Sequence, residues 1–137
     1  MANLMGHDLD ALVDLLRDTV AELRAVFLFG SAADHTDGKD SDLDIALLSN
    51  QPLDPLLLWE LSSTLADLAG CPVDLVDLRQ ASTVMKYQVV SKGQVLWQAD
   101  HAGDLFVSVA QREYWDWEIT RRPIMERIRE TGSVYGR

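Results

Sequence analysis

Apolar residues recur along much of this chain with the spacing of one helix face. Over residues 8–23, leucines and valines return every three or four positions, and aspartates gather at the N-terminal end, where the helix dipole stabilises negative charge. Residues 53–69 repeat the pattern and are followed by Gly70, a typical C-cap residue. Residues 81–91 and about 103–130 also have helical spacing. The pattern therefore predicts four main helices.

Short apolar runs lie between these helices and predict strands. They cover residues 24–29, 42–48, 73–78 and 94–97. With a short helix beginning at Ser31, the predicted order is α-β-(short α)-β-α-β-α-β-α. This order is typical of an α/β or α+β domain in which helices pack on one mixed sheet. We expect one domain over residues 1–137, with a core at about 8–98 and a C-terminal helical segment at about 103–130.

Charge and cysteine content narrow the function classes. The net charge is −10, from 12 basic and 22 acidic residues, which argues against direct binding to a nucleic-acid backbone. Cys71 is the single cysteine, so an intrachain disulfide is excluded and we expect a cytoplasmic protein. No apolar run approaches the ~20 residues of a membrane-spanning helix, so we expect no membrane partner.

One segment carries candidate chemistry. It reads Gly30-Ser31, then ten residues, then Asp42-Leu43-Asp44, with an apolar run on each side. A glycine turn lets backbone N–H groups approach a phosphate. Side chains alternate along a strand, so Asp42 and Asp44 point to the same side. Two neighbouring carboxylates repel each other unless a cation lies between them, and a hard ion such as Mg²⁺ suits that site.

A third carboxylate comes from the next predicted strand, which contains Asp74 and Asp77 on opposite faces. If Asp74 lies beside Asp42 and Asp44, three carboxylates converge, and they could hold one or two Mg²⁺ ions together with nucleotide phosphates and water. Asp77 is the alternative. One of the basic residues Arg79, Lys86 and Lys92, which follow this strand, could also meet a triphosphate, although ordinary helix-surface positions are favoured.

This set of residues resembles the polymerase-β-type nucleotidyltransferase superfamily. The resemblance rests on Gly30-Ser31, the ten-residue spacing to Asp42-Leu43-Asp44, and Asp74 on a later strand. The short length is similar to the minimal nucleotidyltransferase (MNT) group, which supplies the antitoxins of HEPN/MNT toxin–antitoxin pairs. The resemblance implies a polymerase-β-like fold with a C-terminal helical extension.

The resemblance also implies roles for single residues. Gly30 and Ser31 would hold the triphosphate of ATP, Asp42 and Asp44 would bind Mg²⁺, and Asp74 would ligate the catalytic metal and help to deprotonate the acceptor. The implied reaction transfers AMP from ATP to a tyrosine hydroxyl of a partner, a HEPN-domain RNase toxin, and releases pyrophosphate. The added negative charge would block the toxin's RNA site.

Two other functions stay open from the sequence. The protein could be a non-catalytic antitoxin that covers a toxin's basic surface with its own acidic one. It could also be a nucleotidyltransferase that modifies a small-molecule hydroxyl, such as that of an aminoglycoside. In the C-terminal segment, Trp115 and Trp117 lie two positions apart on a predicted helix, so they cannot both face one core. We therefore expect a protein interface there, in a hetero-complex.

Overall fold

The computed structural model describes residues 9–30 and 42–131, and for the last ten of these residues it describes the backbone alone. The elements follow in the order α1 (Leu9–Thr19), β1 (Leu23–Phe29), β2 (Leu43–Ser49), α2 (Pro55–Ala69), β3 (Val73–Asp77), α3 (Thr83–Lys92), β4 (Gln94–Gln98) and α4 (Ala102–Thr131). The predicted short helix at Ser31 lies outside the described residues.

The four strands form one mixed sheet in the order β3-β2-β1-β4. Strand β1 is antiparallel to β2 and to β4, whereas β2 and β3 are parallel. The end of β1 therefore meets the beginnings of β2 and β3 at one end of the sheet. This arrangement confirms the predicted mixed sheet and brings the glycine turn and the acidic residues to the same place.

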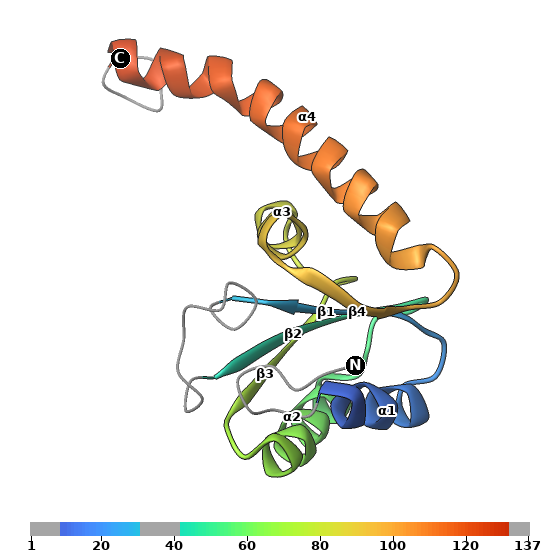
Figure 1. Cartoon of the computed structure of the whole chain (residues 1–137). Helices are drawn as coiled ribbons and strands as arrows, with labels where there is room; N and C mark the ends of the chain where they lie inside the picture. The colour runs from blue at the N-terminus through green and yellow to red at the C-terminus, as the bar shows by residue number, and fades with distance from the viewer. Residues whose placement is uncertain (1–8, 31–41, 132–137) are drawn as a thin grey trace.

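Helices cover both faces of the sheet (Figure 1). Helices α1 and α2 pack on one face, where Leu12, Leu16 and Ile45 are fully buried. Helices α3 and α4 lie over the other face, where Phe27 and Ala46 are buried. Since neighbouring residues on a strand face opposite sides, the nearly continuous apolar runs of β1 and β2 supply both cores.

The helix boundaries agree with the predictions except near residue 20. Helix α1 ends at Thr19 rather than at 23, because Glu22 adopts a left-handed conformation with φ of 57° and Leu23 already belongs to β1. Gly70 confirms the predicted C-cap: its φ is 77°, and its N–H donates to the carbonyl of Ala66. Asp54 caps the beginning of α2 by accepting from the N–H of Leu56.

Helix α4 is the longest element, with 30 residues, or about 45 Å at 1.5 Å per residue. Its first half packs on α3 and the sheet, and Tyr114 stacks on Tyr87 with a centroid distance of 3.8 Å. Its second half projects away from the rest of the molecule (Figure 1). Among the described residues, no helix is both long and apolar enough to cross a bilayer.

Candidate active site

Two of the predicted carboxylates are direct neighbours in the sheet. Asp44 on β2 and Asp74 on β3 are register partners in the parallel pair. Both alternate with residues of the core under α3 and α4, namely Ala46 and Val76, so both carboxylates lie on that face. Asp44 is half-buried, whereas Asp74 is exposed. The structure therefore brings Asp44 and Asp74 together where β2 and β3 begin.

Gly30 lies directly against this pair. It follows Phe29, the register partner of Asp44 on β1, and its φ is 76°. A Cβ added at position 30 would overlap the Oδ2 atom of Asp44. Both the left-handed backbone and the lack of space favour glycine here. The two halves of the predicted motif therefore meet in the folded chain, while Ser31 lies outside the described residues.

Asp44 is the residue of the site whose carboxyl group has a shifted pKa. Burial raises the pKa of its carboxyl above the ordinary value, and the negative charges of Asp74 and Asp42 raise the pKa further. A hydrogen bond acts in the same direction, because a protonated Asp44 can donate to the Asp74 carboxyl. Clustered carboxylates that disfavour each other's charge are typical of a site completed by a cation or by a shared proton.

Asp77 has a different role from Asp74. It is 6 % exposed and lies on the opposite face of β3, toward α2. Its carboxylate accepts hydrogen bonds from the N–H of Leu53 at 2.7 Å, the N–H of Arg79 at 3.0 Å and the side-chain amide of Gln80 at 2.8 Å. These bonds tie the end of β3 to the segment before α2. Of the two alternatives, Asp74 is the one that the fold places beside Asp44.

The donor set has the chemistry that Mg²⁺ prefers, although the site is not a closed cage. Within residues 9–30 and 42–131, no three histidine, cysteine or acidic side chains form a ready-made metal group, and Asp42 is exposed just before β2. Mg²⁺ usually takes only one or two carboxylates and completes its shell with water and substrate phosphates. Asp44 and Asp74, with Asp42 near them, fit that requirement.

The basic residues after β3 separate into two groups. Lys92 ends α3 immediately before Gly93, and an added Cβ at Gly93 would contact the Leu28 carbonyl, so Lys92 lies at the same end of the sheet as the carboxylates. Arg79 and Lys86 instead line a cavity near the other end. The sequence pattern did not reveal this cavity, because its walls come from elements far apart in the chain.

The fold and the site define a nucleotidyltransferase domain. The family described as polymerase beta, nucleotidyltransferase matches residues 11–102, and the chain belongs to this family. The resemblance drawn from Gly30, Asp42, Asp44 and Asp74 is thereby confirmed at the level of the family, as is the predicted fold.

Comparisons with individual proteins point to one branch of the family. The chain is 38% identical over 117 residues to protein adenylyltransferase MntA of Shewanella oneidensis, across 85% of this chain and 84% of that protein. It is also similar to a crystal structure of a toxin–antitoxin with AMP-PNP, with a TM-score of 0.79 and 38% identity over 85% of this chain and 94% of that one. A third similar structure is the MNT antitoxin complexed with the tri-AMPylated Shewanella oneidensis HEPN toxin, with a TM-score of 0.73 and 37% identity over 85% and 92%.

Proposed function

We propose that this protein is an antitoxin that transfers AMP from ATP to a tyrosine hydroxyl of a cognate HEPN-domain RNase toxin in the cytoplasm. The observation that carries the proposal is the contact of Gly30 with Asp44 and of Asp44 with Asp74, in a chain 38% identical to a protein adenylyltransferase. The relatives solved with AMP-PNP and with an AMPylated HEPN toxin support the nucleotide and the partner.

Each residue of the site has a part in the reaction. Gly30, together with Ser31, lets backbone N–H groups reach the triphosphate. Asp42, Asp44 and Asp74 would hold Mg²⁺, which supplies charge neutralisation at the phosphates and a more acidic acceptor hydroxyl. The acceptor oxygen forms a bond to the α-phosphorus, and the bond from that phosphorus to the β-phosphate oxygen breaks. Asp74, exposed at the edge of the site, takes the hydroxyl proton, and pyrophosphate leaves.

The raised pKa of Asp44 is consistent with a site that is built for a cation. Without a cation, Asp44 is held near two other carboxylates at an energetic cost. Binding of Mg²⁺ with the nucleotide would reverse the sign of these interactions. The chain would therefore favour metal and nucleotide together over either alone.

The excess of acidic residues favours one further candidate function. With a net charge of −10, the protein could neutralise a toxin by binding to its basic RNA-contacting surface, without any chemistry. Such an antitoxin would be needed in equimolar amount and would not depend on its aspartates. An enzyme would act in substoichiometric amount and leave the toxin inhibited after its own removal.

Intact-mass spectrometry of the toxin tests the proposal. A cognate HEPN toxin would be incubated with a tenth of its amount of the protein, ATP and Mg²⁺. We expect mass increases in whole AMP units, which the Asp42→Ala/Asp44→Ala variant does not produce. Asp67→Ala, which removes an exposed aspartate of α2, is the matched control and should remain active. If the toxin mass stays unchanged while a tight complex forms, the protein neutralises the toxin by binding and not by AMP transfer.

A further inference from the structure

A cavity of about 610 Å³ lies near the end of the sheet opposite the carboxylates. It is bounded by the beginning of β1, the end of β2, the first turn of α3 and the first half of α4. We call it the distal cavity. The residues that the argument uses are Arg24, Arg79, Lys86, Leu105, Val109 and Glu113. Because Asp44 and Asp74 lie at the other end of the strands, this cavity does not belong to the candidate active site.

The distal cavity gathers positive charge in a strongly acidic chain. Arg24 is half-buried and is the extra residue at a register shift in β1. The Nε of Arg79 donates to the Ser49 carbonyl at 2.6 Å. In the part of the chain that the structure describes, neither arginine forms an ion pair, although acidic residues outnumber basic ones by 22 to 12. Two arginines without a carboxylate partner make this cavity suited to an anionic group.

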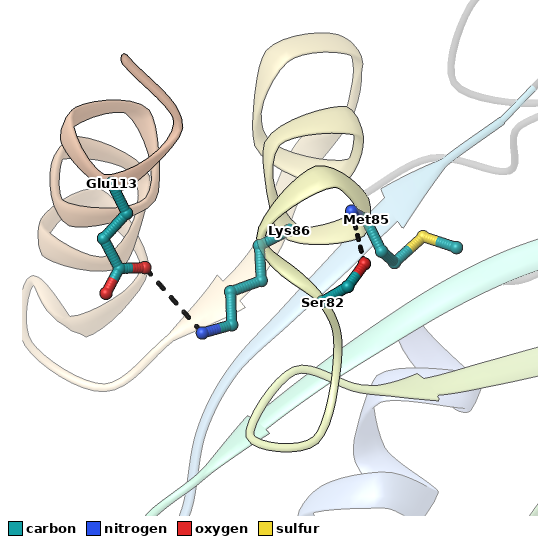
Figure 2. A network of polar contacts seen from close by, with 4 residues as sticks. All are labelled: Ser82, Met85, Lys86 and Glu113. Atoms are coloured by element: carbon teal, nitrogen blue, oxygen red, sulfur yellow. Dashed lines mark hydrogen bonds and ion pairs between the residues drawn. The ribbon is translucent and has the colours of Figure 1, made fainter. Parts of the chain in front are cut away.

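The other charges at the cavity do not cancel this excess. Lys86 on α3 faces Glu113 on α4 across the gap between the helices, with 3.8 Å between the lysine Nζ and a carboxylate oxygen (Figure 2). The positive charge of Lys86 and the negative charge of Glu113 therefore offset each other. His101 and Asp100 also line the cavity, and the carboxylate of Asp100 offsets one of the two arginine charges. With three basic and two acidic lining residues, the cavity keeps a net charge of +1 in a chain whose total charge is −10.

Exposed apolar side chains continue from the cavity along one side of α4, with the exposed Arg112 and Asp116 between them. Leu105 and Val109, which line the cavity, are 66% and 39% exposed, and Trp115 and Ile119 are 54% and 65% exposed. At 3.6 residues per turn these four side chains lie within about one third of the helix circumference. We call them the α4 ridge. Exposed apolar residues in such a row, tryptophan included, are typical of a protein-binding surface.

We propose that the distal cavity and the α4 ridge form the docking surface for the HEPN toxin, and that an acidic side chain flanked by apolar residues of the toxin enters the cavity. This inference rests on the proposed function for the identity of the partner. The arginines select the acidic group, and Leu105 and Val109 contact its apolar neighbours. A small molecule in the cavity would leave the rest of the ridge uncovered, whereas a protein covers both.

A second copy of the chain fits this surface less well than a toxin does. In a two-fold dimer the same patch meets itself, so Arg24 and Arg79 of one copy would meet basic residues of the other. Like charges across an interface disfavour that pairing. An acidic segment of a different protein has no such conflict.

The position of the docking surface separates binding from chemistry. Helix α4 begins beside β4, passes over α3 and continues beyond the sheet (Figure 1). A toxin held on α4 leaves the beginnings of β2 and β3 open to ATP and to the acceptor tyrosine. Changes on the ridge should therefore alter the affinity for the toxin and the KM for it, and leave kcat and nucleotide binding unchanged.

The experiment compares two pairs of charge-changing variants of the full chain. Leu105→Glu changes the ridge, and its matched control is Leu56→Glu, at a 60% exposed leucine of α2 on the opposite face of the sheet. Arg79→Glu changes the cavity and loses the hydrogen bond to Ser49. Its control is Arg17→Glu, which reverses the same charge at an exposed arginine of α1 and also loses one contact, the stacking on Trp97. For each variant we would measure the Kd for the toxin, the KM and kcat of AMP transfer, and the Kd for AMP-PNP. Circular dichroism would verify folding.

We expect Leu105→Glu and Arg79→Glu each to weaken toxin binding at least tenfold and to raise KM in parallel. Both controls should match the wild type, as should kcat and AMP-PNP binding in all four variants. Wild-type affinity in Leu105→Glu would overturn the docking surface, and wild-type affinity in Arg79→Glu alone would overturn the acidic anchor. A change of the isolated protein from dimer to monomer in Leu105→Glu would assign the ridge to a second copy instead.

The same measurements distinguish failure of the docking surface from failure of the proposed function. If the wild type binds the toxin without transferring AMP, the proposed adenylyltransferase activity is wrong. The affinities of the four variants for the toxin still test the docking surface in that case. If the wild type transfers AMP and all variants bind equally, the docking surface alone is wrong. If the wild type does not bind the toxin at all, both proposals fail.

Discussion

Gly30 stands so close to Asp44 that any side chain at position 30 would overlap the Asp44 carboxylate. The contact joins the end of β1 to the beginning of β2, across the two halves of the motif. It explains why the position is glycine through two independent constraints, a φ of 76° and the absence of space for a Cβ. These constraints can be separated by experiment, because Gly70 also has a positive φ but has space for a Cβ.

The variant Gly30→Ala should therefore be more harmful than Gly70→Ala. Gly70 has a φ of 77° and no atom within 4 Å of an added Cβ, so both variants carry the left-handed strain of about 1–2 kcal/mol. Only Gly30→Ala also displaces Asp44, and misplacing a catalytic group by about 1 Å can lower the rate about 100-fold. Thermal unfolding and AMP transfer would be measured for both. Equal activity of the two variants would contradict the proposed role of this contact.

The raised pKa of Asp44 predicts how stability varies with pH in the absence of divalent cations. A folded-state pKa above the ordinary value of 3.8 means that the folded protein binds the proton more tightly than the unfolded chain. Stability from this group is therefore present below the unfolded pKa and is lost as the pH rises through the folded pKa. At neutral pH the charged Asp44 destabilises the fold.

The variant Asp44→Asn should accordingly be more stable than the wild type at pH 7 in EDTA, by up to about 1 kcal/mol for the removal of like charges on adjacent strands. The difference should shrink as the pH falls toward 4. Urea denaturation at several pH values measures it, with Asp67→Asn, at an exposed aspartate of α2, as the control. A variant that is less stable than the wild type at pH 7 would show that burial and charge repulsion do not dominate at Asp44.

Sequence patterns predicted the elements well because each core position is marked by local spacing. The strand predicted over residues 42–48 is Leu43–Ser49 in the structure, and the helix predicted over residues 53–69 is Pro55–Ala69. The end of α1 was misplaced, because the helical spacing of apolar residues continues through Val20 to Leu23 and cannot reveal a left-handed turn at Glu22. Leu23 is buried as the first residue of β1 instead.

The candidate site was predictable in part, and the reason is the alternation of strand side chains. That rule placed Asp42 and Asp44 together and put Asp74 and Asp77 on opposite faces. It could not choose between Asp74 and Asp77, because the choice depends on the β2–β3 register and on which helices cover each face. The distal cavity was not predictable, since Arg24 and Leu105 are 81 positions apart and meet only in the folded chain.

The binding of nucleotide and metal should be interdependent. Because Asp44 and Asp74 repel each other without a cation, we expect AMP-PNP with Mg²⁺ to raise the unfolding temperature far more than either ligand alone. A ligand at 100 times its Kd stabilises a protein by about 2.7 kcal/mol. The shift should disappear in Asp42→Ala/Asp44→Ala and persist in Asp67→Ala. An equal shift with AMP-PNP in EDTA would contradict a metal site formed by these carboxylates.

Replacing the two aspartates of β3 should have opposite effects: loss of Asp77 should lower stability, and loss of Asp74 should lower activity. Asp77 accepts three hydrogen bonds in a buried position, so Asp77→Ala leaves donors unpaired and should cost about 1–3 kcal/mol of stability. At temperatures where it is folded, its kcat should stay near that of the wild type. Asp77→Asn keeps an acceptor oxygen and should recover part of the loss.

Asp74→Ala should show the reverse behaviour. Its side chain is exposed, and its removal relieves repulsion with Asp44, so the unfolding temperature should stay the same or rise. Loss of a group that receives the acceptor proton typically lowers a rate by about 10²- to 10⁴-fold, and loss of a metal ligand acts in the same direction. The kcat of AMP transfer and the unfolding temperature, measured on both variants, give a two-by-two comparison. Loss of transfer in folded Asp77→Ala together with full transfer in Asp74→Ala would move the third carboxylate to Asp77, against the register of β2 and β3.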